Sequence, residues 1–169
     1  LVTSTRLDAY CGLYCGACLI YQSTQDGNLA TAATTLGRPE EGLACDGCRS
    51  SRVTLACRDC WYRDCPAKKG YTSCAECPEM PCDSLKSLQT RRPHLVEIVD
   101  NLRALRADGS ASGHALWCAG QAKRWTCPSC GKATWWYETT CSACGAMVPS
   151  GYVMSAQNRG AGSPQQVCS

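Results

Sequence analysis

Cysteine sets the limits on what this chain can fold into. The 169 residues include 17 cysteines and no phenylalanine, so large apolar side chains are few for a chain of this length. A small core stabilises a domain weakly, and such chains need cross-links or metals. Most of the cysteines fall in C-x2-C pairs, whose members rarely bridge each other but can share one metal ion. The sequence therefore predicts metal binding, not a disulfide framework.

The expected compartment follows from the same residues. The first residues, LVTSTRLDAYCG, have no basic region followed by an apolar run, and no segment approaches the apolar length that spans a bilayer. We therefore expect a cytoplasmic protein with no membrane contact, in a reducing environment that keeps thiols available for metal. The net charge of +3 is too weak to indicate nucleic-acid binding by itself.

Cysteine density divides the chain into four expected segments. Residues 1–83 read as a Cys-rich metal-binding domain, and residues 84–122 as a helical connector. Residues 123–148 read as a four-cysteine knuckle of the zinc-ribbon or rubredoxin kind. Residues 149–169, with several Gly and Pro, read as a flexible tail. The expected fold class is a small, loop-rich, metal-dependent α+β protein.

Apolar periodicity predicts the helices. A helix is expected over residues 93–107, because five aliphatic side chains recur there at helical spacing: Leu95, Ile98, Val99, Leu102 and Leu105. Core packing is the favoured role of this stripe, and a partner-binding groove is the alternative. Shorter helices are expected over 84–90, with Asp83 as the cap, and over 17–24 and 29–36. The rest of the first segment is expected to form loops around cysteines.

The strongest single motif lies near the C-terminus. Its two C-x2-C pairs, ten residues apart, supply the four expected ligands of a tetrahedral sulfur site: Cys127, Cys130, Cys141 and Cys144. Gly131 and Gly145 follow the pairs, where the turn needs a positive φ. Structural Zn²⁺ is favoured, and a rubredoxin-like iron is the alternative. The intervening residues are expected to form a hairpin, with Trp125 packed on the knuckle and three strand formers: Trp135, Trp136 and Tyr137.

Basic residues beside these aromatics raise a second possibility. Lys123, Arg124 and Lys132 lie next to the tryptophans of the knuckle, and ribbons with such neighbours can bind nucleic acid. A short basic stretch is more often solvated surface, so nucleic acid is not the expected partner.

Eleven further cysteines form the second constellation. They read as three triads and one pair, and all are candidate cofactor ligands: Cys11, Cys15, Cys18, Cys45, Cys48, Cys57, Cys60, Cys65, Cys74, Cys77 and Cys82. Triads favour two [4Fe–4S] clusters, each held by four thiolates. Further Zn²⁺ is the alternative, since Cys45/Cys48 with Cys57/Cys60 would make a zinc set. The first triad also matches the motif of radical S-adenosylmethionine enzymes, but the chain lacks the length and βα alternation of their barrel.

Several motifs in order resemble one family. They are CGLYCGAC at 11–18, CDGC at 45–48, the run from Cys57 to Cys65, and GYTSCAECPEMPCDSL at 70–85. Together they resemble an uncharacterised Cys-rich family, domain of unknown function 3795, of bacteria and archaea, many of them anaerobes. All eleven cysteines match family positions, so the resemblance implies metal binding but no reaction. Cys118 and Cys168 do not match and are expected to be free thiols.

The residues argue against independent catalysis. Only two histidines exist, and His94 is expected to face solvent or cap a helix while His114 lies in a Gly/Ser-rich turn. Four-thiolate metal sites are closed to substrate. We therefore expect a non-catalytic accessory or small subunit of a larger, anaerobic enzyme. If [4Fe–4S] clusters are present, this subunit is expected to transfer electrons. A nucleic-acid-binding or regulatory module and a metal- or thiol-handling protein are the alternatives.

Overall fold

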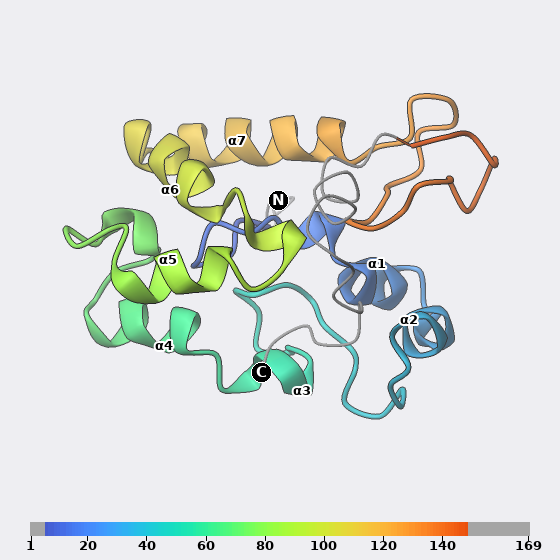
Figure 1. Cartoon of the computed structure of the whole chain (residues 1–169), viewed down its shortest axis with the longest axis horizontal. Coiled ribbons are helices and arrows are strands. Elements are labelled where there is room, and N and C mark those ends of the chain that lie inside the picture. Colours follow the sequence, from blue (N-terminus) through green and yellow to red (C-terminus); the bar gives the residue numbers. More distant parts are fainter. Residues whose placement is uncertain (1–5, 149–169) are drawn as a thin grey trace.

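The structure, a computed structural model, describes residues 6–148 as a mostly helical assembly joined by loops (Figure 1). Residues 149–169, with the predicted tail and Cys168, lie outside the described residues. Within the described part, the helices and 3₁₀ turns follow in this order: η1 (Cys15–Ala17), α1 (Leu19–Gln25), α2 (Leu29–Leu36), α3 (Leu55–Arg58), α4 (Trp61–Lys68), η2 (Cys74–Glu76), α5 (Asp83–Gln89), η3 (Pro93–Leu95), α6 (Ile98–Ala107) and α7 (Ala111–Arg124).

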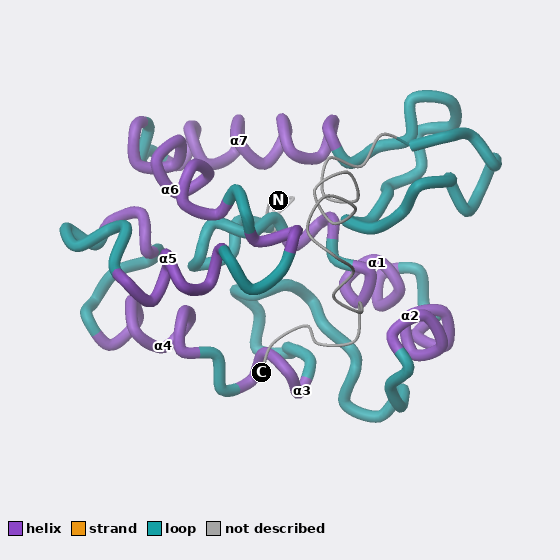
Figure 2. The backbone as a smooth tube through the Cα atoms, viewed as in Figure 1, coloured by secondary structure: helices purple, strands orange, loops and turns teal. Residues whose placement is uncertain are grey.

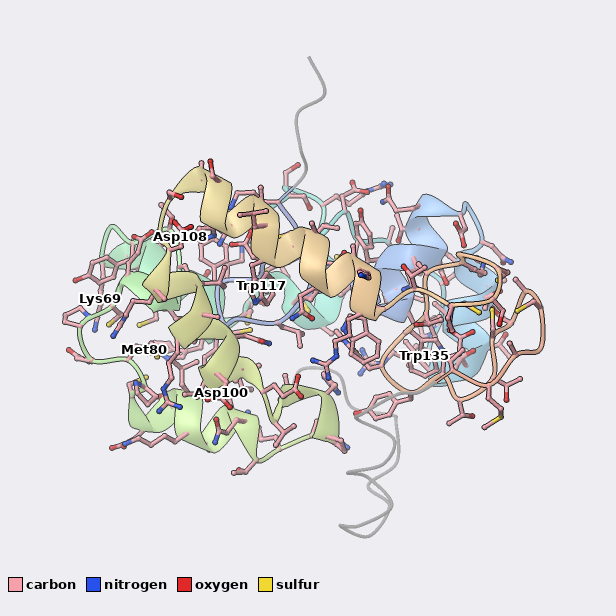
Figure 3. All side chains as sticks on the ribbon, turned by 90° about the horizontal axis from the view of Figure 1, so that it is seen from above. Lys69, Met80, Asp100, Asp108, Trp117 and Trp135 are labelled. Carbon is pink, nitrogen blue, oxygen red and sulfur yellow. The ribbon has the colours of Figure 1, made fainter. Side chains whose placement is uncertain are left out.

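The helices gather in two groups, and the loop that precedes η1 runs between them (Figure 2). In Figure 1, α7 and α6 lie along one side, with α5 and α4 below them, while α1 and α2 form the opposite end together with the C-terminal loops. Figure 3 shows the same arrangement from above, with Trp135 in the C-terminal loops beside α1 and with Lys69 and Met80 at the far end. This brings α1 into contact with the C-terminal loops, where the Gln22 side chain donates to the Thr134 carbonyl.

The stripe predicted over 93–107 forms the main core. Ile98 and Leu102 are fully buried and Leu105 is almost so, and they pack with apolar residues of α5, η2 and η3. The core-packing role predicted for the stripe is thus confirmed. The helix itself is divided, because Pro93 begins the short turn η3 and α6 starts only at Ile98.

Other helix predictions differ from the structure mainly at the ends. The range 29–36 coincides with α2, and 17–24 corresponds to η1 followed by α1. Asp83 is the first residue of α5 and not its cap, which is Cys82; the carboxylate still lies at the positive end of the helix dipole.

Three helices were not predicted. α3 and α4 occupy a stretch expected to be loop, and α7 occupies the Gly/Ser-rich stretch around His114. α7 has a weak apolar face and two interior glycines, Gly113 and Gly120, which lower its helix propensity. Its start is fixed by capping, because the Ser110 hydroxyl accepts the N–H of Gly113 at 3.0 Å.

The expected α+β class is wrong for the described residues. Residues 6–148 contain no strand (Figure 2), only isolated bridges such as Thr126 to Ala133 and Thr140 to Met147. The segment with Trp135, Trp136 and Tyr137 forms no hairpin, because these rings pack on the rest of the protein. Among these residues, no helix combines the length and apolar character needed to cross a membrane.

Candidate metal centres

Two tight turns build the C-terminal site. The N–H of Gly131 donates to the Cys127 carbonyl, and that of Gly145 donates to the Cys141 carbonyl, both at 2.9 Å. The two glycines have φ angles of 77° and 73°, as the sequence predicted. A side chain at either position would be strained in this left-handed region, so each glycine closes one turn and aims its cysteine pair at the other.

The four sulfurs meet at the spacing of a single tetrahedral ion. The Sγ atoms of Cys127 and Cys144 are 3.7 Å apart, and those of Cys130 and Cys141 are 3.6 Å apart. All four sulfurs lie within 4.8 Å of one another. Zn–S bonds of about 2.3 Å in a tetrahedron place sulfurs about 3.8 Å apart, so the set fits zinc. Iron with four thiolates needs a similar tetrahedron.

The turns also prepare one sulfur to bind as a thiolate. The backbone N–H groups of Cys130 and Ser129 point at the Cys127 sulfur and lower its pKa to about 7. Glu138 ties the loop between the turns to the second turn, since its carboxylate accepts the N–H of Trp135 at 3.1 Å and that of Ser142 at 2.8 Å. Sequence reasoning missed Glu138, and its spacing from the cysteines carries no distinctive signal.

Aromatic packing fixes this site to the helical body. Trp125 and Trp136 are 3% exposed and pack with Tyr14 and Ala17. Trp125 thus packs both on Trp136 of the predicted knuckle segment and on the N-terminal segment, while Cys127 and Cys141 form a separate cluster. The side-chain amide of Gln22 adds a polar tie, donating to the carbonyls of Gly16 at 2.8 Å and Thr134 at 2.9 Å.

His94 is buried, contrary to the prediction that it faces solvent or caps a helix. Its ring is 3% exposed and stacks on Trp136 with centroids 4.3 Å apart. Its Nδ1 shares a 2.6 Å hydrogen bond with the Tyr137 hydroxyl. Burial, helped by the charge of Arg92, lowers the pKa of His94 to about 3. The ring is therefore a neutral packing element between the core and the C-terminal loops.

His114 lies on α7 and not in a turn. Its Nδ1 is 3.0 Å from a carboxylate oxygen of Asp8, a residue that is fully buried. Two arginines share that carboxylate, Arg6 at 2.6 Å and Arg49 at 2.8 Å. Burial opposes the charge, but the hydrogen bonds to Arg6 and His114 and the positive charges of Arg49 and Arg6 prevail and lower the pKa of Asp8. This network ties three distant segments together.

Nine of the eleven N-terminal cysteines gather around two regions. At the first, the N–H of Cys48 lies 3.4 Å from the Cys15 sulfur. Burial raises the pKa of Cys15 well above its usual value, and the charges of its neighbours Cys48, Cys18 and Cys45 raise it further. We call Cys15, Cys18, Cys45 and Cys48 the N-terminal tetrad.

The second region surrounds Cys74. Burial raises the pKa of Cys74 to about 12, and further increases come from the charges of nearby cysteines: Cys65, Cys82, Cys77 and Cys60. Cys11 lies between the regions, since the cysteines that act on its thiol are Cys48, Cys60 and Cys74. Cys57 lies on α3 and Cys118 on α7.

The two constellations differ in spacing. Within residues 6–148, only the C-terminal set brings three or more potential ligand atoms within 4.8 Å of one another. The N-terminal cysteines therefore converge without reaching the spacing of ligands on one ion.

The basic residues near the knuckle are largely engaged. Arg124 binds Glu97 at 2.7 Å and lies over the Trp125 ring, and Lys132 reaches Asp26 at 3.5 Å. A cation held by an internal carboxylate contributes less to phosphate binding.

Comparison with known proteins finds one family similar to the cysteine-rich segment. Residues 7–87 match the family model described as "Protein of unknown function (DUF3795)". The match covers all eleven N-terminal cysteines and ends before the C-terminal site. Comparisons with curated proteins and with solved structures found no match. The predicted resemblance of residues 7–87 to the DUF3795 family is therefore confirmed.

Proposed function

We propose that this chain is a non-catalytic metalloprotein that serves as an accessory or small subunit of a larger enzyme. The observation that carries the proposal is the closed C-terminal site. Cys127, Cys130, Cys141 and Cys144 supply all four ligands of a tetrahedral ion, which leaves no open position for substrate. Zn²⁺ bound there would hold the C-terminal loops against α1 and would act as a structural brace.

The histidines support a role without independent catalysis. A general acid or base needs a free ring nitrogen and a pKa near the working pH. His94 stays neutral and is stacked on Trp136, while His114 is engaged by the buried Asp8. Both histidines therefore serve packing and internal pairing.

An exposed surface on α3 and α4 supports docking. Leu55 and Trp61 are 53% and 57% exposed, and a large exposed tryptophan is typical of the centre of protein interfaces. An open pocket of about 490 Å³ lies beside them, lined by Ser51, Arg52, Val53, Arg58 and Arg63. The matching partner surface is an apolar patch surrounded by carboxylates.

The N-terminal cysteines suggest a specific function for the accessory subunit, which is electron transfer. Their convergence around two regions suits two [4Fe–4S] clusters, whereas zinc in the same regions would make the domain structural only. Protein purified without oxygen distinguishes the two by its absorption spectrum and by iron, sulfide and zinc per chain. Zinc alone in every site would contradict an electron-transfer role.

The docking surface is tested by a matched pair of variants. Trp61→Ala truncates the proposed interface, and Leu116→Ala truncates another exposed side chain, 71% exposed, on α7 at the opposite side of the molecule (Figure 1). Co-purification of the full chain from its native host should yield a complex of fixed stoichiometry with a larger enzyme. Trp61→Ala should weaken it about thirtyfold, the effect of an interface residue worth about 2 kcal/mol. Equal affinities for the two variants would contradict this docking surface.

A further inference from the structure

Two C-x2-C turns that are 30 residues apart in sequence meet at the start of α1. Cys15 and Cys18 bracket the η1 turn, and the N–H of Cys48 points at the Cys15 sulfur at 3.4 Å. Gly47 lies so close that a Cβ placed on it would be 4.0 Å from the Cβ of Cys15. We propose that the N-terminal tetrad ligates one [4Fe–4S] cluster: Cys15, Cys18, Cys45 and Cys48.

The other two members of the tetrad share a second contact. Cys18 packs against the apolar cluster of α1 and α2 that contains the buried Cys45. The Cys45 N–H donates to the Thr24 hydroxyl at 3.0 Å, which attaches the second pair to the helix that begins after the first. α1 therefore holds both pairs in position from one side.

The surroundings of the tetrad call for a compensating metal. Cys15 and Cys45 are buried, and Cys18 and Cys48 are partly buried. Several thiolates in apolar surroundings are stable only if positive charge offsets them. Metal ions supply that charge, and iron–sulfur clusters accept ligands of this type.

Spacing distinguishes a cluster from a single ion. The C-terminal cysteines close to within 4.8 Å of one another, but no three sulfurs of the tetrad do so. A cubane cluster binds each thiolate to a different iron, so its ligands lie farther apart than those of one ion. The tetrad also differs from the zinc set suggested by spacing alone, in which Cys45 and Cys48 pair with Cys57 and Cys60.

Four cysteines of the same half-buried class allow a controlled test: Cys18, Cys48, Cys57 and Cys118. Each is replaced by alanine in the full chain, purified without oxygen, and iron, sulfide and zinc per chain are measured. Cys18→Ala and Cys48→Ala should each remove one cluster, about four irons, and the double variant should lose no more than either single one. Cys118→Ala should lose no iron. Any iron lost in Cys57→Ala should add to the iron lost in Cys48→Ala when the two substitutions are combined.

Three results would overturn the assignment. They are a wild-type protein without iron, a Cys18→Ala/Cys48→Ala double variant that loses two clusters, and a shared loss for Cys48 and Cys57 that spares Cys18. Retained zinc at the C-terminal site shows that a variant has folded. If alanine prevents folding, Cys48→Ser provides a second readout, because an oxygen ligand changes the electron paramagnetic resonance spectrum of the cluster it binds. An unchanged spectrum would also overturn the assignment.

This inference rests on metal binding by the N-terminal half, which is one part of the proposed function, and not on the accessory role. Metal content is measured on the isolated chain and does not depend on a partner. If Trp61→Ala failed to weaken the complex, the assignment of the tetrad would still stand. If the metal analysis contradicted the tetrad, the docking proposal would still stand.

Discussion

Acid should weaken this protein through His94, the ring that joins the helical core to the C-terminal loops. The folded protein holds His94 neutral, with its pKa lowered to about 3 by burial and by the charge of Arg92. In the unfolded chain the same group takes up a proton near pH 6.5. Because the unfolded state binds the extra proton, stability present above pH 6.5 is lost as the pH falls towards 3.

The size of this effect follows from the two pKa values. Between pH 7 and pH 5, the unfolded chain gains about 2 kcal/mol more than the folded protein from protonation of His94. His94→Phe keeps a flat ring against Trp136 and removes the titration. The variant loses the hydrogen bond to Tyr137 at every pH, so only the change between the two pH values bears on the prediction.

Urea unfolding of the metal-loaded protein at pH 7 and pH 5 measures the difference. The wild type should lose about 2 kcal/mol more unfolding free energy than His94→Phe over this interval. Other acid-sensitive groups, including Asp8 and the metal ligands, contribute equally to both proteins and cancel. Equal losses in the two proteins would refute the assignment of a neutral, buried His94.

Three further perturbations have defined outcomes. Asp8→Asn leaves Arg6 and Arg49 without their buried counter-charge and should cost about 3 kcal/mol in urea unfolding, whereas a loss below 1 kcal/mol would contradict a stabilising network. Trp136→Ala empties the contact with His94 and should cost about 3–5 kcal/mol; little change would show that the loops are held elsewhere. Cys130→Ala should lower zinc by about one ion per chain without changing iron, and unchanged zinc would contradict the C-terminal site.

The helices illustrate how far sequence reasoning reached. The stripe from Leu95 to Leu105 predicted a buried face because its periodicity is strong and local. α7 was missed because its stability comes from the Ser110 cap and from tertiary contacts, not from an apolar repeat. Trp135, Trp136 and Tyr137 have high strand propensity, but packing of Trp136 on His94 and Ala17 overrides that weak preference.

The candidate metal ligands likewise include some that the sequence could predict and some whose grouping it could not. Cys127, Cys130, Cys141 and Cys144 were predictable because the two C-x2-C turns lie close in sequence and glycine permits their geometry. The grouping of the eleven N-terminal cysteines was not, because similar spacings fit several pairings. The contact between Cys15 and Cys48 spans 33 residues, and nothing local encodes it.

Sequence alone predicted that this protein binds metal, because 17 cysteines replace the apolar side chains that would otherwise make a core. It also identified the four C-terminal cysteines that could hold a metal ion and the buried face of the central helix. Only the tertiary structure decided which distant cysteines meet, why both histidines are buried, and how the C-terminal loops attach to α1. Those features arise from contacts between segments far apart in the chain, and their free energy exists only once the segments have come together.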